Sequence, residues 1–195
     1  HLYRRRQRQM CIRDSSKDIK KNSVFFGVKG QKFDGNKFGI EAIKNNAILA
    51  ITNKKSKNSR NIFSKNPFEK LNKFSSIYRK SLDSNNIAIT GSAGKTSVKD
   101  LTGFCLNKLD KTYYSKNSFN NKYGVPLSII NSPQSTKFSV LEVGMDKKGE
   151  IDTLTKLIRP NLGLITNISY AHIKNFKNLD EIAKAKSEII NNIFP

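Results

Sequence analysis

The stretch N-I-A-I-T-G-S-A-G-K-T-S (86–97) constrains the fold of this chain more than any other. A short apolar strand runs directly into a loop bounded by Gly91 and Gly94, and a helical pattern follows. Glycines at these positions let successive backbone N–H groups point at phosphate oxygens, and a helix N-terminus adds the positive end of its dipole. The general phosphate-loop pattern has four residues between its glycines, whereas this loop has two. The alternative is an ordinary strand–turn–helix with a surface lysine.

If the loop binds a nucleotide, its residues contact different parts of the ligand. Lys95 would reach the β- and γ-phosphates, and the Thr96 hydroxyl would hold Mg²⁺. The predicted ATP-binding residues are Gly91, Ser92, Ala93, Gly94, Lys95, Thr96 and Ser97.

The rest of the chain alternates short apolar runs with helical patterns, which predicts an α/β fold with mostly parallel sheets. We expect strands at 23–28, 47–52, 86–90, 138–143 and 162–166, and helices at 38–46, at 68–82, after Lys95 and from Leu179. The turn-rich residues 83–86 suggest a boundary between a domain at 16–83 and a second domain from 84 to 195. In the helix after Lys95, helical spacing predicts one buried face formed by Val98, Leu101, Cys105 and Leu109.

Three polar groups follow the phosphate loop. Asn120 and Asn121 precede a Gly-x-Pro turn, so they either contact a polar substrate or serve the turn itself. Glu142 ends a strand, where ligands bind in open α/β sheets, so it is either a Mg²⁺ ligand or a solvated strand end. His172 follows another strand and is either a metal ligand or structural.

The last predicted helix places Lys186 on its apolar face. A lysine there extends to solvent or loses its charge through burial. The apolar residues at helical spacing around it are Leu179, Ile182, Ala183, Ile190 and Ile193.

The formal net charge of +21 suggests nucleic-acid binding or AT-rich codon usage. The 28 lysines are scattered, which favours codon usage and no nucleic-acid partner. No apolar run is long enough to cross a bilayer. Two cysteines cannot form a disulfide framework, so a cytoplasmic protein is expected.

Five segments in order resemble the Mur ligases, the ATP-dependent amide ligases that build the peptidoglycan peptide. They are ITGSAGKTS, NNKYGVPL, LEVGMDKKGEI, TNISYAHIKNF and EIAKAKSEI, and the resemblance extends from about residue 16 to the end. The short phosphate loop is that family's own form. NNKYGVPL and the run after His172 favour the member that adds D-alanyl-D-alanine to UDP-N-acetylmuramoyl-tripeptide. The remaining alternatives are the third-residue-adding member and an unrelated phosphate-loop NTPase.

The resemblance implies ATP and Mg²⁺ as cofactors and an acyl-phosphate intermediate. Thr96 and Glu142 would hold Mg²⁺, His172 would bind a second Mg²⁺, and Lys186 would be carbamylated, with Lys95 and Lys186 as catalytic residues. Asn120 and Asn121 would contact substrate. Ala93 stands where the family has an asparagine, so a side-chain amide is missing from the loop.

The first domain resembles the family's UDP-binding domain, and Ser16 would touch the UDP diphosphate. The resemblance also implies a third, C-terminal domain that this chain lacks, so we expect the chain alone to be inactive. We also expect it to be a monomer.

The first fifteen residues differ in composition from the rest. Arg4, Arg5, Arg6, Arg8 and Arg13 precede the first lysine, Lys17, after which lysine dominates. The run RRQRQMCIRD resembles a translated sequencing-library adaptor, so we expect 1–15 to be non-native. Removing residues 1–14 takes away five arginines and one aspartate, which lowers the formal net charge from +21 to +17.

Overall fold

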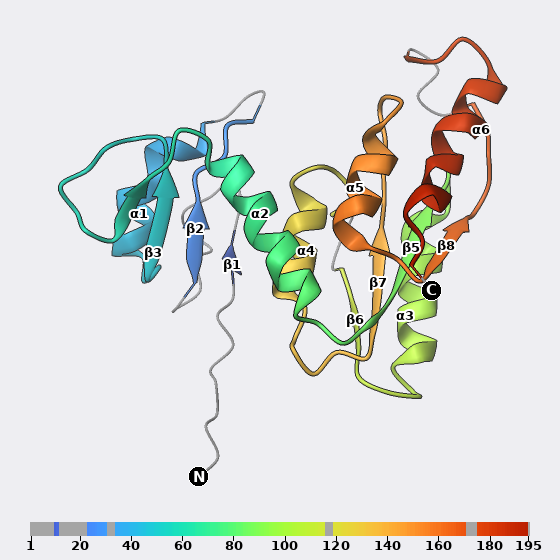
Figure 1. Cartoon of the computed structure of the whole chain (residues 1–195), viewed down its shortest axis with the longest axis horizontal. Coiled ribbons are helices and arrows are strands. Elements are labelled where there is room, and N and C mark those ends of the chain that lie inside the picture. The colour runs from blue at the N-terminus through green and yellow to red at the C-terminus, as the bar shows by residue number, and fades with distance from the viewer. Residues whose placement is uncertain (1–9, 12–22, 31–33, 116–118, 171–174, 195) are drawn as a thin grey trace. The chain divides into compact units, whose positions relative to one another are not determined.

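The computed structural model describes residues 10–11, 23–30, 34–115, 119–170 and 175–194 (Figure 1). The chain divides into two compact units, His1–Phe74 and Ser75–Pro195. Each unit carries its own four-stranded sheet. Ser16 and His172 lie outside the described residues.

The first unit is built on a parallel sheet of order β1-β2-β3-β4. Its elements are β1 (Met10–Cys11), β2 (Val24–Phe26), the 3₁₀ helix η2 (Gly35–Phe38), α1 (Gly39–Lys44), β3 (Leu49–Thr52) and β4 (Asn61–Phe63). Helix α1 buries Ala42 and Ile43 against Phe25 and Ala50 of the sheet. Parallel strands buried in this way read as continuous apolar runs, which is why β2 and β3 could be recognised in the sequence.

Polar side chains order the loops at the carboxyl ends of these strands. The Asn36 Oδ1 atom accepts the backbone N–H of Asn53 at 2.7 Å, directly after β3. Thr52 donates to the Asn61 Oδ1 atom at 3.1 Å. The side chains that make these hydrogen bonds are all buried, namely those of Asn36, Thr52 and Asn61. These hydrogen bonds are therefore made without competition from water.

Helix α2 (Pro67–Lys80) spans the division between the units. Its C-terminal half belongs to the second unit and is anchored there by Arg79, whose buried guanidinium donates to the carbonyls of Ile158 at 2.7 Å and Leu82 at 3.2 Å. Burial, and secondarily the charge of Arg159, lowers the pKa of Arg79. Carbonyls at a helix C-terminus lack intrahelical donors, so Arg79 satisfies groups that would otherwise be unpaired.

The second unit has a parallel sheet of order β6-β7-β5-β8. Its elements are β5 (Asn85–Thr90), α3 (Lys95–Leu106), β6 (Thr112–Tyr114), α4 (Gly124–Asn131), β7 (Phe138–Glu142), α5 (Glu150–Ile158), β8 (Leu162–Ile165), α6 (Leu179–Ser187) and the 3₁₀ helix η4 (Glu188–Asn192).

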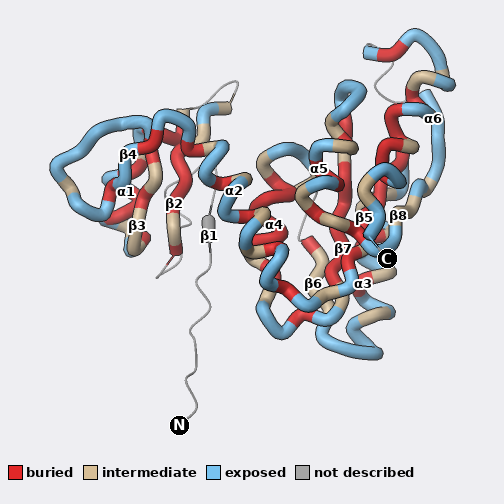
Figure 2. Tube along the Cα trace, viewed as in Figure 1, coloured by how far each residue is buried: buried red, intermediate tan, exposed pale blue. Residues whose placement is uncertain are grey.

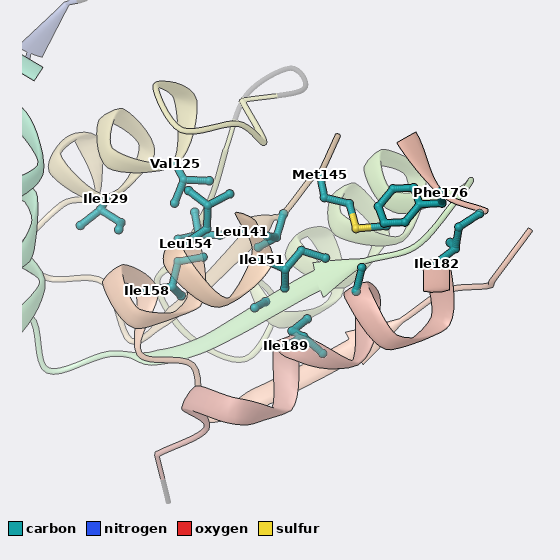
Figure 3. Packing of buried hydrophobic residues seen from close by; sticks show 13 residues of the cluster. Val125, Ile129, Leu141, Met145, Ile151, Leu154, Ile158, Phe176, Ile182 and Ile189 are labelled. Carbon is teal, nitrogen blue, oxygen red and sulfur yellow. The ribbon is translucent and has the colours of Figure 1, made fainter. Parts of the chain in front are cut away.

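The core of this unit lies on one face of the sheet (Figure 3). Leu141 of β7 packs there with residues of α4, α5 and α6, including Ile151 and Ile182. Because side chains alternate along a strand, Glu142 points to the opposite face, where α3 lies. The side chain that ends β7 therefore meets the helix that follows the phosphate loop.

The predicted α/β fold with parallel sheets is confirmed. The sequence patterns did not reveal β1, β4, β6, α4 or α5 as elements. All five of these elements are at most nine residues long, too short for a hydrophobic period to stand out.

The predicted buried face of α3 is wrong. Leu101 is 65% exposed, Leu109 is 77% exposed, and Cys105 is an exposed free thiol. Most of α3 is exposed or intermediate along its length (Figure 2). The buried positions of α3 are Lys99 and Gly103. A Cβ atom at position 103 would collide with the Tyr114 ring, so glycine permits the close approach of α3 to β6. Helix α3 therefore packs on β6 through Gly103. The spacing of hydrophobic residues cannot indicate a contact made by a glycine.

The buried face of α6 is partly as predicted. Ile182 and Lys186 are buried, but Ile190 is 61% exposed and Ile189 is buried in its place. The change to 3₁₀ geometry at Glu188 explains this shift, because three residues per turn rotate the apolar face relative to an α-helix. Among the described residues, none of the helices has the length and apolar character needed to cross a membrane.

Candidate nucleotide site

The phosphate loop lies at the carboxyl end of β5, where its two glycines have left-handed backbone angles. Gly91 has a φ of 150° and Gly94 a φ of 76°. Gly94 is the N-cap of α3 and, as a glycine, has no side chain with which to cap this terminus. The first N–H groups of a helix have no intrahelical acceptor, and together with the helix dipole they attract anions. The loop therefore presents an anion-binding helix terminus at the sheet edge where ligands bind in α/β folds.

Lys95 folds back over the loop that precedes it. Its Nζ atom donates to the Gly91 carbonyl at 2.8 Å and lies 3.5 Å from the Ser92 carbonyl. The ammonium group is thus held beside the loop by main-chain oxygens. A lysine in this position supplies a fixed positive charge for phosphate oxygens.

Thr96, Glu142 and Asn120 form one hydrogen-bonded group. The Thr96 hydroxyl donates to Glu142 Oε2 at 2.8 Å, and the Asn120 amide donates to Glu142 Oε1 at 2.7 Å. Glu142 is only 1% exposed. Both carboxylate oxygens therefore have a donor, which a buried carboxylate requires. The structure brings these three predicted site residues together from α3, β7 and the segment before α4.

These residues have the donor chemistry that Mg²⁺ prefers. Magnesium is bound through oxygen atoms, usually one or two protein ligands together with water and substrate phosphates. Thr96 and Glu142 provide a hydroxyl and a carboxylate beside the phosphate loop. Within the described ranges, no three side chains of His, Cys, Asp or Glu gather into a metal-binding group. A site with two protein ligands completed by phosphate oxygens fits this arrangement.

Asn121 has a different partner from Asn120. Its Oδ1 atom accepts the backbone N–H groups of Tyr123 and Gly124, both at 3.0 Å, at the start of α4. The side chain therefore orders the turn into this helix, as asparagine does in many turns. Its predicted contact with substrate stays a prediction.

Lys186 is 2% exposed on the inner face of α6. Burial, and secondarily the charge of Lys95, lowers the pKa of Lys186 to about 8. Within the part of the chain that the structure describes, none of the hydrogen bonds or ion pairs involves its Nζ atom. An ammonium in this position is poorly stabilised. The neutral amine is therefore populated at a lower pH than in an ordinary lysine.

Two residues near the loop were not singled out as site residues by the sequence. Lys99 is fully buried, and its Nζ atom donates to the Ser115 carbonyl at 2.6 Å and lies 3.2 Å from Asp100. Asn167 accepts hydrogen bonds from the phosphate loop itself. Lys99 lies four positions after Lys95 and therefore on the same face of the helix, and this spacing could have revealed it. No comparable sequence pattern points to Asn167.

Comparison with known proteins identifies relatives for most of the chain. Residues 89–195 match the family model of the Mur ligase middle domain. A protein from Rickettsia prowazekii named UDP-N-acetylmuramoyl-tripeptide–D-alanyl-D-alanine ligase is 35% identical over 93% of this chain and 41% of its own length.

Solved structures agree with this match. A crystal structure of MurF from Acinetobacter baumannii superposes with a TM-score of 0.84 at 30% identity, over 93% of this chain and 40% of that one. MurF ligase from Thermotoga maritima in complex with ADP superposes with a TM-score of 0.84 at 29% identity, over 96% of this chain and 44% of that one. The chain thus spans less than half the length of the proteins it resembles.

Proposed function

The chain belongs to the Mur ligase family, and we propose that it is the nucleotide-binding part of a ligase that adds D-alanyl-D-alanine to UDP-N-acetylmuramoyl-tripeptide. The observation that carries the proposal is the hydrogen-bonded group of Thr96, Glu142 and Asn120 beside the phosphate loop. The name of the Rickettsia prowazekii relative and the ADP complex of the Thermotoga maritima enzyme support it.

In this proposal the reaction has two steps. The terminal carboxylate of the tripeptide attacks the γ-phosphorus of ATP, which forms an acyl phosphate and releases ADP. The amine of D-alanyl-D-alanine then attacks the acyl carbon, which forms the amide bond and releases phosphate and one proton. Catalysis of this kind depends mainly on positioning and on stabilising charge that develops in the transition state.

The chain's own residues orient and neutralise the phosphates. The N-terminus of α3 and the Lys95 ammonium bind their oxygens. Thr96 and Glu142 hold the Mg²⁺ that, when bound, neutralises charge on the transferring phosphate. Asn120 fixes the orientation of the Glu142 carboxylate through its hydrogen bond to Oε1. His172 as a ligand of a second Mg²⁺, and Ser16, Asn120 and Asn121 as substrate contacts, are part of the same proposal.

Lys186 is proposed to be carbamylated. Its neutral amine attacks CO₂, which forms an N–C bond and releases one proton, so that a buried cation becomes a carboxylate-like anion. The burial of the side chain supports this, because it favours the neutral amine that must react. In ¹³C-bicarbonate, we expect the chain to show a carbamate carbon resonance that Lys186→Met lacks. An identical resonance in the variant would contradict the assignment.

The substrate proposal is tested by calorimetric titration of the 195-residue chain. We expect UDP-N-acetylmuramoyl-tripeptide to bind at least tenfold more tightly than UDP-N-acetylmuramoyl-dipeptide, the substrate of a third-residue-adding ligase. Equal affinity for the two, or a preference for the dipeptide, would contradict addition of D-alanyl-D-alanine. A control titration with UDP alone separates recognition of the peptide from recognition of the nucleotide.

A further inference from the structure

The segment 166–169, directly after β8, lies along the phosphate loop and is hydrogen-bonded to it. The Ser92 hydroxyl donates to the Ser169 carbonyl at 3.0 Å and accepts the Ser169 N–H at 2.9 Å. The Thr166 hydroxyl donates to the Ala93 carbonyl at 2.6 Å. These contacts join segments that are more than seventy residues apart in sequence. The conformation of the loop is therefore set by the segment after β8 as well as by the loop's own glycines.

Asn167 provides two of the acceptors in this contact. Its backbone carbonyl accepts the N–H of Ser92 at 3.0 Å, and its Oδ1 atom accepts the N–H of Ala93 at 2.9 Å. These are the two successive N–H groups in the middle of the loop. Since each is directed at Asn167, the donors that remain for phosphate oxygens belong to the end of the loop and the first turn of α3.

The Asn167 side chain is not needed to fill a core. The residue is exposed and lies beyond the end of β8. Its carboxamide reaches back to the loop at Ala93, whose methyl group has no hydrogen-bonding capacity of its own. The contact thus supplies an amide, from the segment after β8, at a loop position that has no polar side chain.

We propose that Asn167 is a positioning residue for the nucleotide phosphates. It holds the N–H groups of Ser92 and Ala93 away from the phosphates, and this fixes the curvature that aims the N-terminus of α3 and Lys95 at the β-phosphate. The inference rests on the proposed nucleotide site but concerns a residue outside the phosphate-loop motif.

The test compares Asn167→Ala with a matched asparagine. Asn178 is also exposed and also accepts a backbone N–H at 2.9 Å, from Glu181 at the start of α6. We expect Asn167→Ala to weaken ADP binding by the 195-residue chain about five- to tenfold, the equivalent of one lost hydrogen bond. AMP binding should weaken less, because AMP lacks the β-phosphate. Asn178→Ala should leave ADP affinity within twofold.

A second readout follows the loop without any ligand. Hydrogen exchange at the Ala93 amide should be faster in Asn167→Ala than in the wild-type chain. Asn167→Asp keeps the side-chain acceptor, so it should restore slow exchange. Fast exchange in the wild-type chain would overturn the proposal.

The outcomes separate this inference from the proposed function. If Asn167→Ala binds ADP as the wild type does while Lys95→Ala loses binding, the positioning role is wrong and the nucleotide site stands. Equal weakening by Asn167→Ala and Asn178→Ala would show a general stability effect and also overturn it. If the wild-type chain does not bind ADP, the proposed nucleotide site fails and the inference fails with it.

Discussion

The hydroxyl of Thr96 donates to the carboxylate of Glu142 at 2.8 Å, across 46 residues of sequence. The register of the sheet explains this contact, because Ile89 of β5 is paired with Glu142 of β7. The two parallel strands end at the same edge, and the loop after β5 brings the first turn of α3 back over it. A hydroxyl and a carboxylate therefore meet where the phosphate loop begins its helix.

We expect Thr96→Val to lower the free energy of unfolding of the second unit by about 1–3 kcal/mol, because a buried carboxylate oxygen loses its donor. Valine has nearly the same shape as threonine, so packing is retained. Urea unfolding followed by circular dichroism measures the change. Thr153→Val is the matched control, since Thr153 is also in the first turn of a helix but its hydroxyl donates to the exposed Gly149 carbonyl. Equal effects of the two substitutions would contradict a special role for the Thr96–Glu142 contact.

The two loop glycines should differ in their tolerance of a methyl group. A Cβ atom at position 91 would collide with the Thr166 hydroxyl, whereas a Cβ atom at position 94 has open space around it. Gly94→Ala should therefore cost only about 1–2 kcal/mol for its left-handed backbone, and Gly91→Ala should cost more. Thermal unfolding of both variants gives the comparison. A smaller loss for Gly91→Ala than for Gly94→Ala would be inconsistent with the close packing of the loop on Thr166.

The stability contribution of Lys186 should depend on pH. In the unfolded chain its pKa is the ordinary value of 10.5, and in the folded chain burial lowers it to about 8. Between these values the unfolded state binds more protons, so the free energy of unfolding rises with pH, and below pH 8 the folded chain carries the full cost of a buried charge. Lys186→Met should be more stable than the wild type at pH 7 by on the order of 1–3 kcal/mol. This difference should shrink from pH 8 to pH 10.

Urea unfolding of both chains in CO₂-free buffer at pH 7, 8, 9 and 10 measures this difference. Other lysines and tyrosines titrate in the same range, but they are common to both chains and cancel. A difference that stays constant from pH 7 to pH 10 would refute a lowered pKa for Lys186. Lys184→Met, at an exposed position of the same helix, should show no pH-dependent difference.

Glu188 should stabilise the second unit from outside the candidate site. Its Oε1 atom accepts the N–H of Gly149 at 2.7 Å and its Oε2 atom accepts the N–H of Asp152 at 3.2 Å. It therefore caps the N-terminus of α5, where Gly149 has no side chain to do so. We expect Glu188→Ala to lower the free energy of unfolding by about 1–3 kcal/mol. Glu181→Ala should cost less, because Glu181 is only partly buried and its carboxylate accepts the Lys177 N–H in an exposed hydrogen bond.

The phosphate loop and the parallel sheets could be predicted because their signals are local. Glycines 91 and 94 between a strand and a helix specify the turn, and buried parallel strands such as β5 are short apolar runs. Lys186 could be placed on a buried face because helical spacing positions it among apolar neighbours. Glu142 could be placed at a strand end, but its two hydrogen-bond partners depend on the order of strands in the sheet.

Other features depend on contacts that sequence patterns do not encode. Leu101 and Leu109 have the spacing of a buried face, yet α3 packs through Gly103 against Tyr114, and only the three-dimensional approach of α3 to β6 decides between the two faces. Asn167 was read as part of a family motif, and its contact with Ala93 arises because β8 is the neighbour of β5. Strand order is a long-range property, which is why these contacts could not be foreseen.

The central claim is that Glu142 and the phosphate loop form one Mg²⁺–nucleotide site. Calorimetric titration of the 195-residue chain with ADP, in the presence and absence of Mg²⁺, tests it most directly. Glu188→Gln serves as the control, because Glu188 is also a buried carboxylate but caps α5 instead. We predict that Mg²⁺ raises ADP affinity at least tenfold in the wild type and in Glu188→Gln, and that Glu142→Gln loses this gain. An ADP affinity that does not respond to Mg²⁺ in the wild type, or a full gain in Glu142→Gln, would contradict the account.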